Sequence, residues 1–199
     1  MSIAKKYRMS FTTSGILRNE SIATVRLFQE YHDWNRVRER IWGDNIFQLQ
    51  KESSLKRIYS EVCARLKHLS LEEMEILTSK QPEDINAILW IAICRHYHFI
   101  GDFAKEVLHE KYLSMQKNLD RSDYAIFYEY KAQTHPELEL LTDATRNRLR
   151  QMLFNFMRNL GLLNKNNEIL PVYLSPVIEN LLKNNNWREI VFFPTRKKG

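Results

Sequence analysis

The stretch LRQMLFNFMRNLGLLNKNNEIL, residues 149–170, carries the two features that decide the predicted fold. Its first half repeats apolar residues at α-helical spacing, and these form one predicted buried stripe: Leu149, Met152, Leu153, Phe156, Met157 and Leu160. Thr142 can cap this helix, and Gly161 suits the left-handed position that ends it. The second half places apolar pairs on both sides of residues 164–168, which predicts a short β-hairpin.

The opposite side of the same helix is polar, and the helix contains neither lysine nor glutamate. The residues on this side are Asn147, Arg150, Gln151, Asn155 and Arg158, with Phe154 expected to be exposed among them. Arginine pairs bidentately with guanine edges or phosphates, and asparagine and glutamine pair with adenine. The face therefore predicts a nucleic-acid recognition helix, and the alternative is an ordinary solvated face.

The rest of the chain is also predicted to be helical. Five glycines and five prolines among 199 residues favour long helices with short loops over an all-β fold, and 44% hydrophobic residues can bury a core. Helices are predicted over residues 15–31, 34–42, 55–69, 103–115, 123–133, 143–160 and 177–184, with two more starting after Ser70 and at Pro82. The predicted fold is all-α with one short β-hairpin, built from helix-turn-helix and winged-helix-like bundles that share one core.

Capping residues and breakers mark the expected boundaries. The residues expected to begin helices are Asp33, Ser53 or Ser54, Ser70 in a capping box with Glu73, Asp102, Ser122, Thr142 and Ser175. Gly101 is expected to interrupt the helical pattern before Asp102. Residues 1–13 lack periodicity and are predicted to form an extended arm, and WREIVFF, residues 187–193, is a candidate edge strand.

The net charge of +6 is unevenly distributed along the chain. Residues 1–68 hold 13 Lys and Arg against 7 Asp and Glu, residues 69–141 hold 7 against 13, and residues 142–199 hold 10 against 4. We therefore divide the chain into a basic N-terminal region (1–68), an acidic helical core (69–141) and a basic C-terminal region (142–199). Basic ends around an acidic middle indicate a polyanionic partner that contacts both ends.

No motif of a known catalytic or metal site is present. His109 begins a sequence like that of zinc proteases, but Leu113 occupies the position of the second ligand. Phosphate-binding glycine loops, nucleophile elbows and Cys-x-x-Cys pairs are also missing. Cys63 and Cys94 each lie in an apolar helical pattern, which predicts buried thiols in a reducing compartment. We expect a non-enzymatic protein without cofactor or metal.

The sequence also predicts a cytoplasmic location. No secretory signal follows the basic residues at the start of the chain. The longest apolar run, AILWIAIC at residues 87–94, is too short to cross a bilayer.

The order of helices, basic helix and hairpin is that of a winged helix-turn-helix, in which the helix enters the major groove of DNA. The first three predicted helices form a second, wingless version. The residues predicted to contact DNA are Lys56, Arg57, Lys67, Arg146, Arg150, Gln151, Asn155, Arg158 and Lys165. Gln151 and Asn155 are the candidate base readers. The tail cations Arg196, Lys197 and Lys198 either contact the duplex or take no part in binding.

Segments along nearly the whole chain resemble the BrxA family of bacterial BREX phage-exclusion systems. The segments that carry the resemblance are SFTTSGILRNES, DWNRVRERI, SSLKRIYSEVCARLKHLS, WIAICRHYHFIGDFAKEVLHEKYL, HPELELLTDATRNRLRQMLFNFMRNLGLL and ILPVYLSP. The resemblance implies an all-helical cytoplasmic protein that binds double-stranded DNA and works with other BREX proteins: a methyltransferase, an ATPase and a phosphatase-like protein. It supplies no catalytic residues.

Two other functions remain open at this point. The same faces could dock acidic surfaces of BREX proteins, which would make the chain an assembly adaptor. The family is also said to resemble an RNA-binding antitermination fold, and single-stranded RNA would stack on an exposed aromatic such as Phe154.

Overall fold

The computed structural model describes residues 6–11, 15–79 and 81–195. Within these ranges the regular structure is helical, with two isolated β-bridges and no strand, which confirms the all-α class. The chain forms two compact units: an N-terminal unit, Ser14–Ala92, and a C-terminal unit, Met1–Thr13 with Ile93–Gly199. These units are defined by contacts, whereas the predicted boundaries at residues 68 and 141 are defined by charge and stay a prediction.

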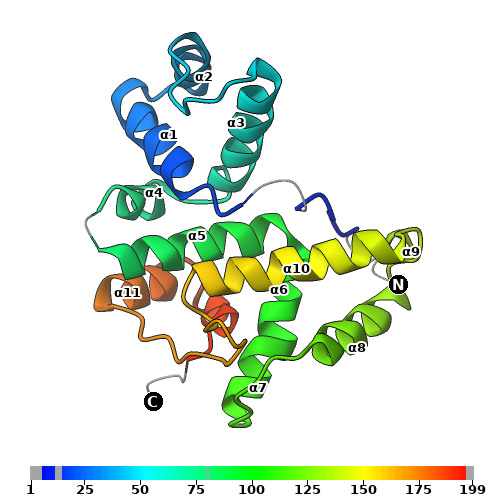
Figure 1. Ribbon diagram of the computed structural model, residues 1–199. Coiled ribbons are helices and arrows are strands. Elements are labelled where there is room, and N and C mark those ends of the chain that lie inside the picture. The colour runs from blue at the N-terminus through cyan, green and yellow to red at the C-terminus, as the bar shows by residue number, and fades with distance from the viewer. Residues whose placement is uncertain (1–5, 12–14, 80, 196–199) are drawn as a thin grey trace. The chain divides into compact units, whose positions relative to one another are not determined.

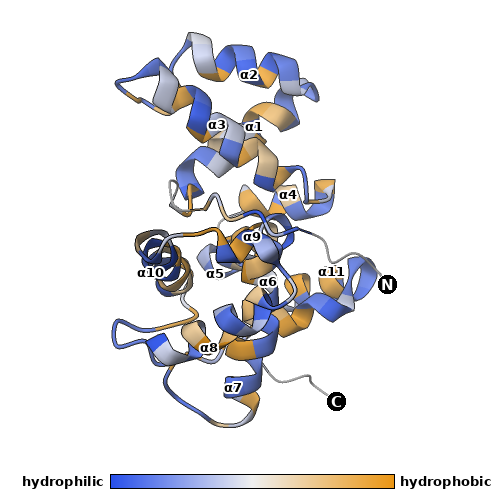
Figure 2. Cartoon of the chain, turned by 90° about the vertical axis from the view of Figure 1, so that its right-hand side faces the viewer, coloured by the Kyte–Doolittle hydropathy of each residue, from blue (hydrophilic) through white to orange (hydrophobic). Residues whose placement is uncertain are grey.

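The N-terminal unit contains α1 (Arg18–Tyr31), α2 (Trp34–Gly43), α3 (Glu52–Leu66), α4 (Leu71–Leu77) and most of α5 (Pro82–His96). Helix α1 packs against α2, α3 and α4 (Figure 1). The buried residues that join α2 and α3 are Val37, Ile41, Leu55, Tyr59 and Cys63. Both helices show hydrophilic residues beside hydrophobic ones, as expected of helices with one buried side (Figure 2).

The helix boundaries of the N-terminal unit follow most of the predicted capping. The Asp33 carboxylate accepts a hydrogen bond from the Asn35 backbone, and Ser70 and Glu73 form the predicted capping box. The prediction that Ser53 or Ser54 caps α3 was wrong: the helix begins at Glu52, and Lys51 precedes it without a side-chain cap. Helix α5 is buried on all sides from Ala87 to Cys94, as its uniformly apolar sequence predicts.

The C-terminal unit contains α6 (His98–Phe103), a π-helical segment η1 (Ala104–His109), α7 (Glu110–Leu113), α8 (Arg121–Ala132), α9 (Pro136–Glu139), α10 (Asp143–Asn159), α11 (Pro176–Asn185) and a 3₁₀ segment η2 (Trp187–Phe192). Segments α6, η1 and α7 follow one another as a continuous helical rod (Figure 1). Their aromatic side chains pack against those of α8, with the Phe103 and Phe127 ring centroids 5.2 Å apart.

Gly101 does not interrupt this helical rod, contrary to the prediction. A Cβ atom at Gly101 would lie 2.9 Å from the carbonyl oxygen of Cys94, so glycine is needed for a close approach of two backbones. Asp102 consequently caps nothing, and its carboxylate accepts a hydrogen bond from the Tyr7 hydroxyl at 2.5 Å. Helix α8 likewise begins at Arg121, with the capping box formed by Asp120 rather than Ser122.

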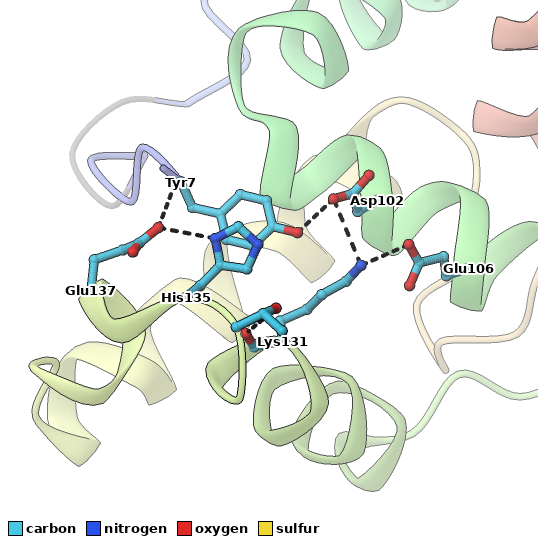
Figure 3. Close-up of polar contacts among 7 residues, drawn as sticks. Tyr7, Asp102, Glu106, Lys131, His135 and Glu137 are labelled. Carbon is cyan, nitrogen blue, oxygen red and sulfur yellow. Dashed lines mark hydrogen bonds and ion pairs between the residues drawn. The ribbon is translucent and has the colours of Figure 1, made fainter. Parts of the chain in front are cut away.

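The N-terminal segment is anchored in the C-terminal unit rather than extended from it. Tyr7 is buried and stacks on the His135 ring with centroids 3.9 Å apart. Its backbone N–H donates to Glu137 at 2.6 Å, and Lys131 bridges the adjacent Asp102 and Glu106 (Figure 3). Phe11 is fully buried and approaches the Tyr97 and Phe156 rings. The extended-arm prediction was therefore wrong for residues 6–11, and its other residues, 1–5 and 12–13, lie outside those described.

The predicted hairpin is reduced to one antiparallel bridge between Leu163 and Ile169. Backbone hydrogen bonds from Leu170 to Leu162 and from Asn164 to Glu168 also join its two halves. The second half pairs in addition with residues 117–119, because the Ile169 N–H donates to Lys117 and the Leu119 N–H donates to Asn167. The predicted edge strand at 187–193 was wrong: residues 187–192 form η2. There the buried Glu189 receives two hydrogen bonds from Arg95, at 2.9 and 2.7 Å.

Candidate nucleic-acid interface

Helix α10 carries the main candidate interface and has the predicted buried side. Thr142 caps it by accepting from the Thr145 N–H, and Gly161 has the expected left-handed φ of 79°. Phe154 is also buried, at 5% exposure, and its ring lies 6.5 Å from that of Phe103 on α6. The prediction that Phe154 is exposed was therefore wrong, and the aromatic platform suggested for RNA is not available.

The solvent-facing side of α10 presents amides and arginines. Among its exposed residues are Asn147, Arg148, Gln151 and Asn155, and Arg158 is partly buried in the same stripe. Arg148 was not among the predicted contacts. It is exposed, and no hydrogen bond or ion pair joins it to any other described residue. Its position could have been found from helical spacing, because Arg148 lies three residues before Gln151 and seven before Asn155.

Arg158 is held in place by neutral groups. Its guanidinium donates to the side-chain oxygen of Asn155 at 2.6 Å and to that of Asn167 at 2.6 Å. Asn167 belongs to the turn after α10 and has a left-handed φ of 62°, which asparagine tolerates. Because both partners are amides, the positive charge of Arg158 is oriented without being neutralised. Lys165 is exposed in the same turn.

Arg146, by contrast, lies among carboxylates. Its guanidinium is 3.5 Å from Glu129 and 3.9 Å from Asp143, and it donates to the Leu141 carbonyl at 3.0 Å. It also covers the Tyr128 ring at 5.0 Å. Two negative charges therefore surround one cation, which weakens the case for Arg146 as a phosphate contact. Its neighbour Arg150 is partly buried and has no hydrogen-bond or ion-pair partner among the described residues.

The N-terminal unit places Lys56 and Arg57 on the exposed side of α3 and Lys67 at an exposed position directly after the helix. Lys56 is paired with Glu52 at 2.5 Å, in an exposed pair that solvent screens. Within the described ranges, Arg57 and Lys67 have no ion-pair partner. Arg57 and Lys67 are therefore better candidates for phosphate contact than Lys56.

Trp42 is a further candidate that the sequence analysis did not single out. Its side chain is 37% exposed, and two cations lie over its ring: Arg38 at 5.4 Å and Lys56 at 5.2 Å. An exposed aromatic ring between cations is a common feature of nucleic-acid contacts. The spacing of four residues between Arg38 and Trp42 was a signal for it, because such residues are neighbours on a helix.

The predicted site residues thus fall into two groups. Arg146, Arg150, Gln151, Asn155, Arg158 and Lys165 lie in the C-terminal unit, and Lys56, Arg57 and Lys67 lie in the N-terminal unit. The first group shares α10 and the turn that follows it, and the second shares α3 and the residue directly after it. The tail cations Arg196, Lys197 and Lys198 lie outside the described residues.

Other features bear on chemistry and location. Cys63 and Cys94 are buried and unbonded, as predicted, and burial raises the pKa of each thiol, which disfavours the reactive thiolate. Within residues 6–11, 15–79 and 81–195, no cluster of three His, Cys, Asp or Glu side chains is arranged to hold a metal ion. Over the same ranges, none of the helices combines the length and apolar character needed to span a membrane.

A solved structure shares the fold of this chain. The chain matches the crystal structure of an uncharacterized protein from Magnetospirillum magneticum with a TM-score of 0.81, over 96% of this chain and 98% of that chain. At 19% identity the likeness is one of fold alone. The family follows from sequence: the family model described as BrxA matches residues 5–186, so the chain belongs to the BrxA family. It is 29% identical to a BREX protein BrxA from Bacillus cereus (strain H3081.97), over 74% of this chain and 72% of the relative.

Proposed function

We propose that this chain is a non-enzymatic component of a bacterial BREX phage-defence system and that it binds double-stranded DNA, mainly through phosphate contacts. Membership of the BrxA family and the similarity to a BREX protein support the first part. The location that goes with this role is the cytoplasm. Its protein partners are other BREX components, of which a methyltransferase, an ATPase and a phosphatase-like protein are the candidates.

One observation carries the DNA-binding part: the solvent-facing stripe of α10 holds cations that no carboxylate neutralises. Arg148 is exposed without a partner among the described residues, and Arg158 is oriented by two amides. A guanidinium that is fixed in place loses little entropy when it contacts a phosphate. Gln151 and Asn155 lie beside these cations and have side chains that can read adenine edges.

Recognition by a helix-turn-helix or winged-helix mode is the finer form of this proposal. In it, α10 enters the major groove, and the turn with Lys165 contacts the backbone. The exposed side of α3, with Arg57 and with Lys67 at its C-terminal end, provides a second helix of similar character in the N-terminal unit.

The test is a titration of labelled duplex DNA, single-stranded RNA and heparin at several salt concentrations. Binding through phosphates predicts that the logarithm of the affinity for duplex falls linearly with the logarithm of salt concentration. Duplex DNA should also bind more tightly than RNA at each salt concentration. Equal retention of heparin and duplex would reduce the proposal to non-specific polyanion binding. Absence of duplex binding at low salt would refute it.

An adaptor function is the second candidate, and one surface feature favours it. A pocket of about 330 Å³ lies beside α8, and the neighbouring Ile126 and Tyr130 are 71% and 63% exposed. Exposed apolar side chains one helical turn apart are typical of protein contacts. If Ile126→Ser and Tyr130→Ser abolish association with a BREX partner but leave DNA binding unchanged, the two functions use separate surfaces.

A further inference from the structure

A second pocket, of about 320 Å³, lies between α8 and α10 within the C-terminal unit. Helix α8 contributes Tyr124 and Tyr128, and α10 contributes Arg146, Asn147 and Arg150. This volume is within the range of small-molecule sites, which measure about 300–1,000 Å³. The pocket lies on the flank of α10 that faces α8.

The Tyr124 hydroxyl is a buried polar group without a hydrogen-bond partner among the described residues. The residue is only 4% exposed. Burial raises the pKa of Tyr124, although the positive charges of Arg150 and Arg146 oppose this rise. The hydroxyl therefore keeps its proton at neutral pH and is a hydrogen-bond donor. Tyr124 lines the pocket, and its unpaired hydroxyl calls for an acceptor because buried polar groups almost always have a partner.

The cations of the pocket are not equivalent. Arg146 lies within 4 Å of Glu129 and Asp143, which also line the pocket and whose side chains are 69% and 93% exposed. Arg150 is partly buried, and its side chain has no hydrogen bond or ion pair with any described residue. The uncommitted groups of the pocket are thus a guanidinium, a buried hydroxyl and the amide of Asn147. Together they match an anion with several acceptor oxygens.

We propose that this pocket binds the phosphate group of a small phosphate monoester, with Arg150 as the ionic contact and Tyr124 as a buried hydrogen-bond donor. A monoester carries close to two negative charges and three acceptor oxygens, which suits a forked guanidinium beside a hydroxyl. The exposed carboxylates of Glu129 and Asp143 repel a continuous polyanion at the rim more than a single small anion. Arg150 then serves this pocket rather than the DNA-binding stripe, so the inference goes beyond the proposed function.

The experiment measures binding to the full chain by calorimetry, with adenosine 5′-monophosphate, inorganic phosphate and adenosine as probes. The two phosphate compounds should bind and adenosine should not. Arg150→Gln should weaken binding of the phosphate compounds about tenfold or more, because it removes a charged donor to the phosphate. Tyr124→Phe should weaken it about fivefold, because it removes a neutral donor. Arg148→Gln is the matched control for the pocket, because Arg148 lies on the same helix and does not line the pocket. Its affinity for the two phosphate compounds should equal that of wild type.

Thermal unfolding of each variant shows whether it is folded. Failure of wild type to bind either phosphate compound at millimolar concentration would overturn the proposal, as would equal affinity of Arg150→Gln and Arg148→Gln. A duplex titration of the same proteins separates this result from the proposed function. If Arg150→Gln loses duplex binding while wild type binds no monoester, Arg150 belongs to the DNA interface and the pocket proposal is refuted. If duplex binding is absent and monoester binding is present, only the proposed function fails.

Discussion

Arg158 and Arg146 provide the sharpest test of how this chain contacts DNA, because they lie on one helix in opposite electrostatic settings. Arg158 is hydrogen-bonded to the amides of Asn155 and Asn167, whereas Arg146 has Glu129 and Asp143 within 4 Å. Substitution of either arginine by glutamine removes one positive charge and keeps a polar side chain. We expect Arg158→Gln to weaken duplex binding and Arg146→Gln to leave it nearly unchanged.

The size of the effect follows from counterion release. Each phosphate contact on B-DNA contributes about 0.9 to the slope of log affinity against log salt concentration. Loss of the Arg158 contact should therefore lower that slope by about 0.9, and it should do so for any DNA sequence. Between about 50 and 200 mM salt this one contact accounts for a roughly 3.5-fold change in affinity. For Arg146 the slope should hardly change, because its charge is already balanced within the protein.

Fluorescence anisotropy of a labelled duplex, measured over this salt range, gives both slopes directly. Asn155→Ala is an informative companion, because it keeps the charge of Arg158 and removes one of its two orienting hydrogen bonds. Its slope should match wild type while its affinity falls. If Arg146→Gln lowers the slope and Arg158→Gln does not, the assignment of the interface from charge compensation is wrong.

Three further outcomes are expected. Gly101→Ala should lower the free energy of unfolding by about 1–3 kcal/mol in chemical denaturation, because its Cβ would meet the Cys94 carbonyl at 2.9 Å; an unchanged midpoint would contradict the close approach. Tyr124→Phe should keep or raise stability in the same assay, by up to about 1 kcal/mol, since the hydroxyl has no partner among the described residues; a marked loss would mean that the hydroxyl is bonded. Burial tends to raise the pKa of Glu137, but the hydrogen bond from the Tyr7 backbone and other bonds outweigh it and lower this pKa. Its stabilising effect is therefore present above the unfolded carboxyl pKa of about 4.3 and disappears as the pH falls through the folded value. In Glu137→Gln the free energy of unfolding should fall less steeply as the pH is lowered below about 4.3. An equal fall in the variant and wild type would show that the Glu137 carboxylate does not stabilise the fold.

The features of α10 that could be predicted are those set by neighbours in the sequence. Its apolar stripe, the Thr142 cap and the left-handed Gly161 all depend on residues within one or two turns. The burial of Phe154 could not be predicted in this way. A helical wheel places it beside the polar face, and only the position of Phe103 on another helix makes that flank an interior one.

Long-range contacts explain the other differences. Tyr7 and Glu137 are 130 residues apart, so no local pattern marks residues 6–11 as part of a core. The hairpin was predicted only in part for a similar reason. Asn167 and Ile169 form backbone hydrogen bonds with residues 117–119, a partner segment that the apolar spacing of residues 162–170 does not reveal.

The net charge of a region predicts the interface less well than the presence or absence of carboxylates beside each cation. The basic C-terminal region owes its charge to ten lysines and arginines, yet Arg146 lies between two carboxylates, one of which, Glu129, belongs to the acidic region. Arg148 and Arg158 have the same formal charge and no such neighbour among the described residues. The free energy of a phosphate contact depends on how much of a cation's charge is not balanced by nearby carboxylates. These two arginines are therefore better evidence for a DNA interface than the net charge of +6 of the region. The same reasoning separates Arg150, which lines the α8–α10 pocket together with Glu129 and Asp143, from the DNA-binding stripe.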